Sequence, residues 1–115
     1  MKILIDDLNE FYDERVRLVK TLMKRESPEE HAELMKWAFQ MLYFDGEDWI
    51  EICRIDNYPH EKQKGSHIHV YKKDEVKRLE LTFQEAEKLI KEISTKILKD
   101  KFKENIDFGD DKDEL

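Results

Sequence analysis

Cysteine is almost absent from this chain of 115 residues: Cys53 stands alone, which excludes an internal disulfide and a zinc site built from several thiolates. Cys53 lies in an apolar, strand-like run, so we expect a buried core thiol. No apolar stretch approaches the roughly 20 residues that a membrane span needs. The stretch Met1–Ile5 is too short for a signal peptide. These absences predict a cytoplasmic protein without a membrane partner.

Charge is abundant, at 43% of the residues, whereas Asn and Gln are scarce, a balance typical of proteins from hot environments. The net charge of −7 argues against a broad nucleic-acid-binding surface. The charge is uneven, however, because residues 54–78 carry seven basic and four acidic side chains. This local excess of positive charge allows a small phosphate-contacting patch.

Acidic residues are concentrated at the C-terminus, where residues 104–115 hold six acidic side chains and one lysine. We predict an acidic, disordered tail there and a single α+β domain over residues 1–103. The last four residues, Lys112–Leu115, spell an endoplasmic-reticulum retention signal, which acts only on proteins that have entered the secretory route. We interpret this ending as a coincidence.

Hydrophobic spacing predicts an α–α–β–β–β–β–α order, with a four-stranded antiparallel meander, two N-terminal helices and one C-terminal helix. The first helix is expected over residues 6–24 from apolar side chains at three- and four-residue spacing, and the second over 27–36 from a Ser-Pro-Glu-Glu capping signal. The predicted strands cover residues 37–44, 49–55, 67–71 and 77–81, with a hairpin turn at Asp45-Gly46. A second capping box, at 82–85, opens the last helix.

Three of the four histidines lie in one segment, residues 54–69, which we regard as the candidate site. His67 and His69 are two residues apart on a predicted strand, so their side chains share one face. Two adjacent imidazoles can act as an acid–base pair or bind a metal. The side chains that could complete the site are His60 in the preceding loop and Arg54 and Asp56 on the neighbouring strand.

Simpler interpretations remain open. A His-x-His pair is often only the solvated face of a strand, and a purely structural pair of Arg54 with Asp56 is an equally simple interpretation. The sequence Asp56-Asn57 before Pro59 is also typical of an ordinary turn. His31 is expected on the exposed side of the second helix, without a role.

The segment resembles the TumE-type toxins of prokaryotic toxin–antitoxin systems. The match spans roughly residues 37–98 and consists of Arg-x-Asp-Asn, Pro-His, Gly-x-His-x-His, a strand, and a helix of the type Phe-x-x-Ala-x-x-Leu-Ile. The positions that match the motif are Arg54, Asp56, Asn57, His60, His67 and His69. The resemblance implies a small toxin with an antitoxin protein as its partner.

Two hypotheses follow. In the first, the chain is a ribonuclease-like toxin acting on RNA or a nucleotide: His67 and His69 supply acid and base, His60 assists, and Arg54 stabilises phosphate charge. In the second, it is a non-catalytic binding or assembly module, a homodimer or a metal binder, with structural histidines. The sequence leaves the cofactor and the metal undetermined.

Overall fold

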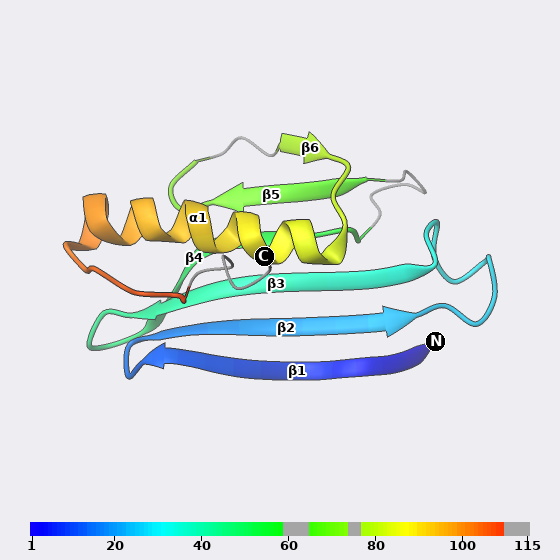
Figure 1. The fold of residues 1–115 in the computed structure, drawn as a ribbon, viewed down its shortest axis with the longest axis horizontal. Coiled ribbons are helices and arrows are strands. Elements are labelled where there is room, and N and C mark those ends of the chain that lie inside the picture. Colours follow the sequence, from blue (N-terminus) through cyan, green and yellow to red (C-terminus); the bar gives the residue numbers. More distant parts are fainter. Residues whose placement is uncertain (59–64, 74–76, 110–115) are drawn as a thin grey trace.

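The computed structural model describes residues 1–58, 65–73 and 77–109. In this part the chain forms an antiparallel meander of five strands, β1–β5, to which a three-residue strand, β6, adds at one edge, followed by one helix (Figure 1). The elements are β1 (Lys2–Asp13), β2 (Val16–Lys24), β3 (Met35–Phe44), β4 (Trp49–Asp56), β5 (Ser66–Val70), β6 (Lys77–Leu79) and α1 (Phe83–Phe102). The α+β class and the antiparallel sheet are confirmed, but the four-stranded sheet with two N-terminal helices is wrong.

The predicted helix over residues 6–24 is the β1–β2 hairpin. The chain reverses at residues 14–15, where the Asp13 carboxylate accepts a hydrogen bond of 2.7 Å from the Arg15 N–H. The apolar residues that suggested a helix are therefore divided between two strands. The period of two in β2 is obscured because Lys20 occupies the inward position that follows Val16 and Leu18 along the strand.

Lys20 is buried through its ion pairs with Glu10 on β1 and Glu87 on α1. Burial alone would lower the pKa of Lys20, but hydrogen bonds to these two carboxylates raise it above its ordinary value. An amphipathic lysine that is paired in this way can replace an apolar residue on the inner face of a strand. The pairing of β1 with β2, together with the ion pairs of Lys20, thus outweighs the helix-like spacing of apolar residues in this part of the sequence.

The second predicted helix, over residues 27–36, is a turn region followed by the start of β3. The Glu30 carboxylate accepts hydrogen bonds from the Glu26 and Ser27 N–H groups, at 2.6 and 3.0 Å. Half of the expected capping box therefore forms, but the chain does not continue as a helix, because residues 35–44 pair with β2 and β4.

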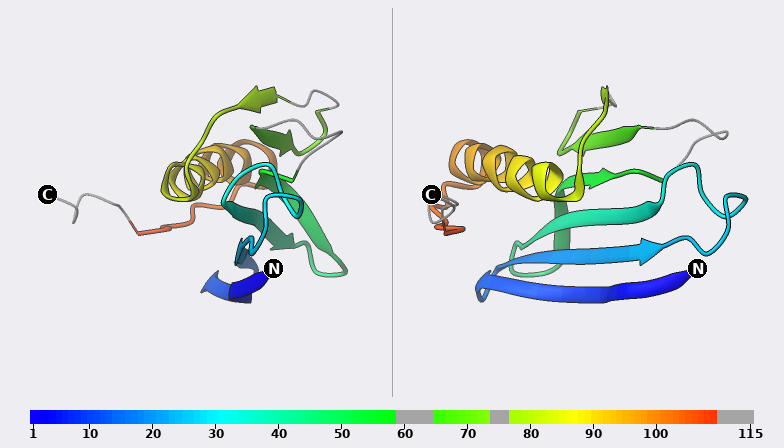
Figure 2. Two further views of the ribbon diagram at one scale, coloured as in Figure 1. Left: turned by 90° about the vertical axis from the view of Figure 1, so that its right-hand side faces the viewer. Right: turned by 45° about the vertical axis from the view of Figure 1, so that its right-hand side comes forward.

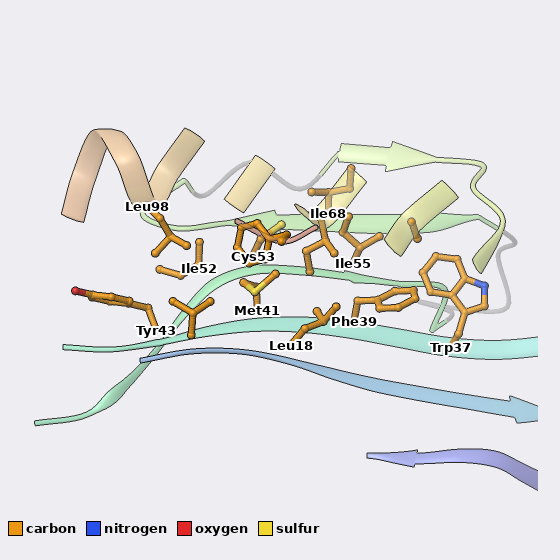
Figure 3. Packing of buried hydrophobic residues seen from close by; sticks show 14 residues of the cluster. Leu18, Trp37, Phe39, Met41, Tyr43, Ile52, Cys53, Ile55, Ile68 and Leu98 are labelled. Carbon is orange, nitrogen blue, oxygen red and sulfur yellow. The ribbon is translucent and has the colours of Figure 1, made fainter. Parts of the chain in front are cut away.

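The core lies between the sheet and α1, which packs on β3 and β4; no helix of the described residues covers the opposite face of the sheet, the open face (Figure 2). Figure 3 shows the inward side chains, among them Phe39, Met41 and Ile55, which are fully buried together with Cys53. Burial raises the pKa of the Cys53 thiol to about 12, as expected for a core thiol.

Two local predictions are confirmed. The β3–β4 turn begins at Asp45-Gly46, where the Asp45 carboxylate accepts hydrogen bonds from Glu47 and Asp48 N–H groups and Gly46 has a φ of 106°. Thr82 and Glu85 form the reciprocal capping box of α1. The helix that it opens buries Ala86, Ile90, Ser94 and Leu98 along one side. No described helix is long and apolar enough to cross a membrane.

The chain after α1 packs against the core over residues 104–109. Lys103 ends the helix with a φ of 58°, and Tyr43 Oη donates a hydrogen bond of 3.1 Å to the Glu104 carboxylate. Ile106 is half-buried, and Phe108, only 7% exposed, contacts Tyr12 edge-on with ring centroids 4.8 Å apart. The disordered tail predicted over 104–115 therefore does not describe its first six residues, because Ile106 and Phe108 anchor them; the rest of that tail lies outside the described residues.

We expect Phe108→Ala to lower the free energy of unfolding by about 2–4 kcal/mol, because it removes a buried aromatic ring and leaves a cavity beside Tyr12. Removal of residues 110–115 should change this free energy by less than about 0.5 kcal/mol. Urea denaturation of both variants measures the difference. Equal stability of Phe108→Ala and the wild type would show that the segment after α1 does not stabilise the core.

Candidate active site

Four predicted site residues form two facing pairs on the open face of the sheet. Arg54 and Asp56 alternate along β4 with core residues, and His67 and His69 flank the buried Ile68 on β5. In the β4–β5 register, Arg54 lies opposite His69, and Asp56 lies opposite His67. The prediction that both histidines share the face opposite to Ile68 is confirmed.

The Asp56 carboxylate is the centre of this group. It accepts a hydrogen bond of 2.9 Å from Arg54 Nε and another of 3.0 Å from the Tyr58 N–H. Its Oδ1 lies 3.9 Å from His67 Nδ1, which is an ion-pair distance for a protonated imidazole and too long for a hydrogen bond. Asp56 is 5% exposed, so the carboxylate acts on its neighbours and has little contact with solvent.

The two histidines differ in how much of each side chain is exposed to solvent. His67 is 8% exposed, whereas His69, opposite the partly exposed Arg54, is half-buried. Burial alone would lower the pKa of the Arg54 guanidinium, but the hydrogen bond and charge of Asp56 raise it. Arg54 therefore keeps its positive charge beside the more accessible His69.

A second cation approaches the site from β3. Lys36 Nζ lies 4.4 Å from the ring centroid of Tyr58, and Arg54 Cζ lies 5.7 Å from the same centroid. Burial raises the pKa of the Tyr58 hydroxyl, so this hydroxyl is protonated at neutral pH. The side of the site toward β3 is thus positively charged around a neutral aromatic ring.

Asn57, a position of the toxin-like motif, has a structural function here. It is 2% exposed, its side-chain oxygen accepts a hydrogen bond of 2.7 Å from the Trp37 N–H, and its amide donates one of 2.7 Å to the Met35 carbonyl. These bonds fix the end of β4 against the beginning of β3. The direction of the chain after Asp56 is set by this contact.

Of the other two histidines, one lies outside the described residues and one differs from expectation. His60 lies outside the described residues, so the structure gives no position for it. His31 was expected on an exposed helical surface; instead it lies in the β2–β3 connection, 4% exposed. Burial lowers the pKa of His31, and neither ring nitrogen has a hydrogen-bond partner among the described residues. Because the prediction placed residues 27–36 in a helix, with His31 on its exposed side, it did not identify His31 as a buried imidazole.

Within residues 1–58, 65–73 and 77–109, no cluster of three or more His, Cys, Asp or Glu side chains could hold a metal ion. The described donor set, one carboxylate and two imidazoles with an arginine against the carboxylate, is instead suited to proton transfer near an anion.

Searches for relatives found no matching family model, no matching curated protein and no matching solved structure. The resemblance to TumE-type toxins therefore rests on the motif residues alone.

Proposed function

We propose that this chain is a toxin-like protein that cleaves RNA, or acts on a nucleotide, at the Arg54–Asp56–His67–His69 site. The observation that supports this proposal is the register, which sets a cation opposite one imidazole and a carboxylate opposite the other on adjacent strands. Cleavage of RNA by its own 2′-hydroxyl needs a base, an acid and a group that stabilises phosphate charge.

The roles follow from exposure. His69, the more accessible imidazole, exchanges a proton with the substrate, and Arg54 binds the phosphate oxygens beside it. His67 is the second acid–base group, with its Nδ1 3.9 Å from Oδ1 of the Asp56 carboxylate. His60 stays an assisting group in this proposal. The setting we propose is the cytoplasm, with an antitoxin protein as the partner that restrains the activity.

The alternative is a non-catalytic binding or assembly module, as a homodimer or with a bound metal, in which the histidines are structural. The burial of Asp56 and His67 favours this alternative, because a substrate must reach a catalytic imidazole. In that case both histidines could be replaced without loss of any chemical activity, and stability alone would change.

A comparison of two arginines tests the phosphate-directed role. Arg54→Ala should reduce RNA cleavage about 10²- to 10³-fold, the usual cost of removing one preorganised charge-stabilising donor. Arg17→Ala is the matched control: Arg17 lies on the same open face, but its Cζ lies over the Trp49 ring, at 4.3 Å, away from the histidines. The assay uses a defined RNA in the presence of EDTA.

Arg54→Ala also removes a hydrogen bond from the buried Asp56 carboxylate and should be the less stable variant, so the two rates are compared under conditions in which both variants are fully folded. Arg54→Lys should recover part of the activity, because it restores the charge without the bidentate geometry. Equal activity of Arg54→Ala and Arg17→Ala would contradict the phosphate-directed role of Arg54.

A further inference from the structure

A groove of about 610 Å³ lies on the other side of the sheet from the candidate active site, between α1 and the β5–β6 edge. Its volume lies within the range of small-molecule binding sites. β5 and α1 run in the same direction, so the end of β5 lies beside the C-terminal half of α1 (Figure 1). The groove therefore follows the helix from Leu89 to Lys101, a length of about 18 Å at 1.5 Å per residue.

One end of the groove is apolar. Ile68 on β5, Leu79 on β6 and Leu89 and Ile93 on α1 line it. Leu79 is 40% exposed, and Leu89 and Ile93 are only half-buried, so apolar surface remains uncovered there by the described chain. Binding of a hydrocarbon group would remove this surface from water.

The other end is cationic. Val70, Tyr71 and Ile97 continue the apolar lining there, and the charged side chains are Lys73, after β5, and Lys96, Lys101 and Asp100, on α1, of which Asp100 is the one acidic side chain among the described lining residues. All four are exposed. This excess of positive charge is notable in a protein with a net charge of −7.

We propose that this groove binds an anionic amphiphile, a long-chain carboxylate or a related acyl compound with a negatively charged head group. The separation of the two surfaces supports this ligand: the hydrocarbon chain would lie against Leu79, Leu89 and Ile93, and the head group would lie among the lysines. The groove and the histidine site lie on different faces, so each proposal can fail without the other.

Titration calorimetry of the full chain with laurate, below its critical micelle concentration, is the first test. We expect saturable binding of one laurate per chain, and decanoate should bind about 15-fold more weakly, because each buried methylene contributes about fourfold. Dodecyltrimethylammonium, with a similar chain and the opposite charge, should bind at least about tenfold more weakly than laurate. Absence of saturable laurate binding, or equal binding of the cationic probe, would overturn the proposal.

Charge reversal tests the head-group end. The double variant Lys96→Glu/Lys101→Glu should weaken laurate binding at least about tenfold. The double variant Lys88→Glu/Lys99→Glu is the matched control, because it changes the charge of the same helix equally at exposed positions that do not line the groove. Equal effects of the two double variants would show that binding is not localised in the groove and would refute the proposal.

Analytical sedimentation of the wild type tests whether a second copy of the chain, rather than an amphiphile, covers the groove. We expect a sedimentation coefficient that does not change when Leu79 is replaced by Glu. A wild-type dimer that becomes monomeric on Leu79→Glu would show that another copy of the chain covers the groove, and would overturn the amphiphile proposal.

Discussion

His69→Ala is expected to reduce the rate of RNA cleavage by about 10²- to 10⁴-fold, the usual contribution of a general acid or base. His69 is the more accessible of the two imidazoles and lies opposite Arg54 in the β4–β5 register, so its loss removes proton transfer beside the bound phosphate. Single-turnover cleavage of a defined RNA measures the effect. His67→Ala should cause a loss in the same range.

The two variants differ in their expected effect on stability. His69→Ala should unfold close to the wild type, because its side chain is only half-buried. His67→Ala removes a side chain that is 8% exposed and should be less stable. Full activity of a folded His69→Ala variant would assign this histidine to the solvated face of β5 and favour the non-catalytic alternative.

Asn57→Ala is expected to lower the free energy of unfolding by about 3–5 kcal/mol. Its side chain is 2% exposed and bonds the Trp37 N–H and the Met35 carbonyl, each at 2.7 Å. Truncation would leave the buried Trp37 N–H and the partly buried Met35 carbonyl without these partners, and each costs about 1–3 kcal/mol. Urea denaturation measures the change.

Ser94→Ala is the matched control for this substitution. Ser94 is fully buried on α1, and its hydroxyl has no hydrogen-bond partner in the described part of the chain. Removing it should change the free energy of unfolding by less than about 1 kcal/mol, or stabilise the protein slightly. Similar losses for both variants would contradict a specific clamp by Asn57.

The sequence predicted the strands β3–β6 and the helix α1 because its local signals there agree with the tertiary structure. The Asp45-Gly46 turn and the Thr82–Glu85 capping box satisfy backbone groups by themselves, and both occur where expected. The two helices predicted for the N-terminal third are wrong because the spacing of its apolar residues suits a helix as well as a hairpin. The turn at Glu14-Arg15 contains no glycine, and the inward Lys20 interrupts the alternation of β2.

The pairing of the site residues followed from a simple property of strands. A spacing of two residues sets both histidines on one face, whatever their function, and the antiparallel pairing of β5 with β4 makes Arg54 and Asp56 their neighbours. Burial could not be predicted in the same way. The 3.9 Å approach of His67 to Asp56 and the clamp formed by Asn57 depend on how β3, β4 and β5 pack, which is a tertiary property.

The most direct test of the proposed chemistry is cleavage of one RNA with and without a single 2′-hydroxyl. The wild-type chain, in the presence of EDTA, should cleave the RNA and leave a 2′,3′-cyclic phosphate, and it should not cleave at a nucleotide that carries 2′-deoxyribose. The His67→Ala/His69→Ala variant should cleave neither substrate. No cleavage of any RNA by the wild type, or equal cleavage at the deoxy position, would contradict an acid–base site that acts through the 2′-hydroxyl.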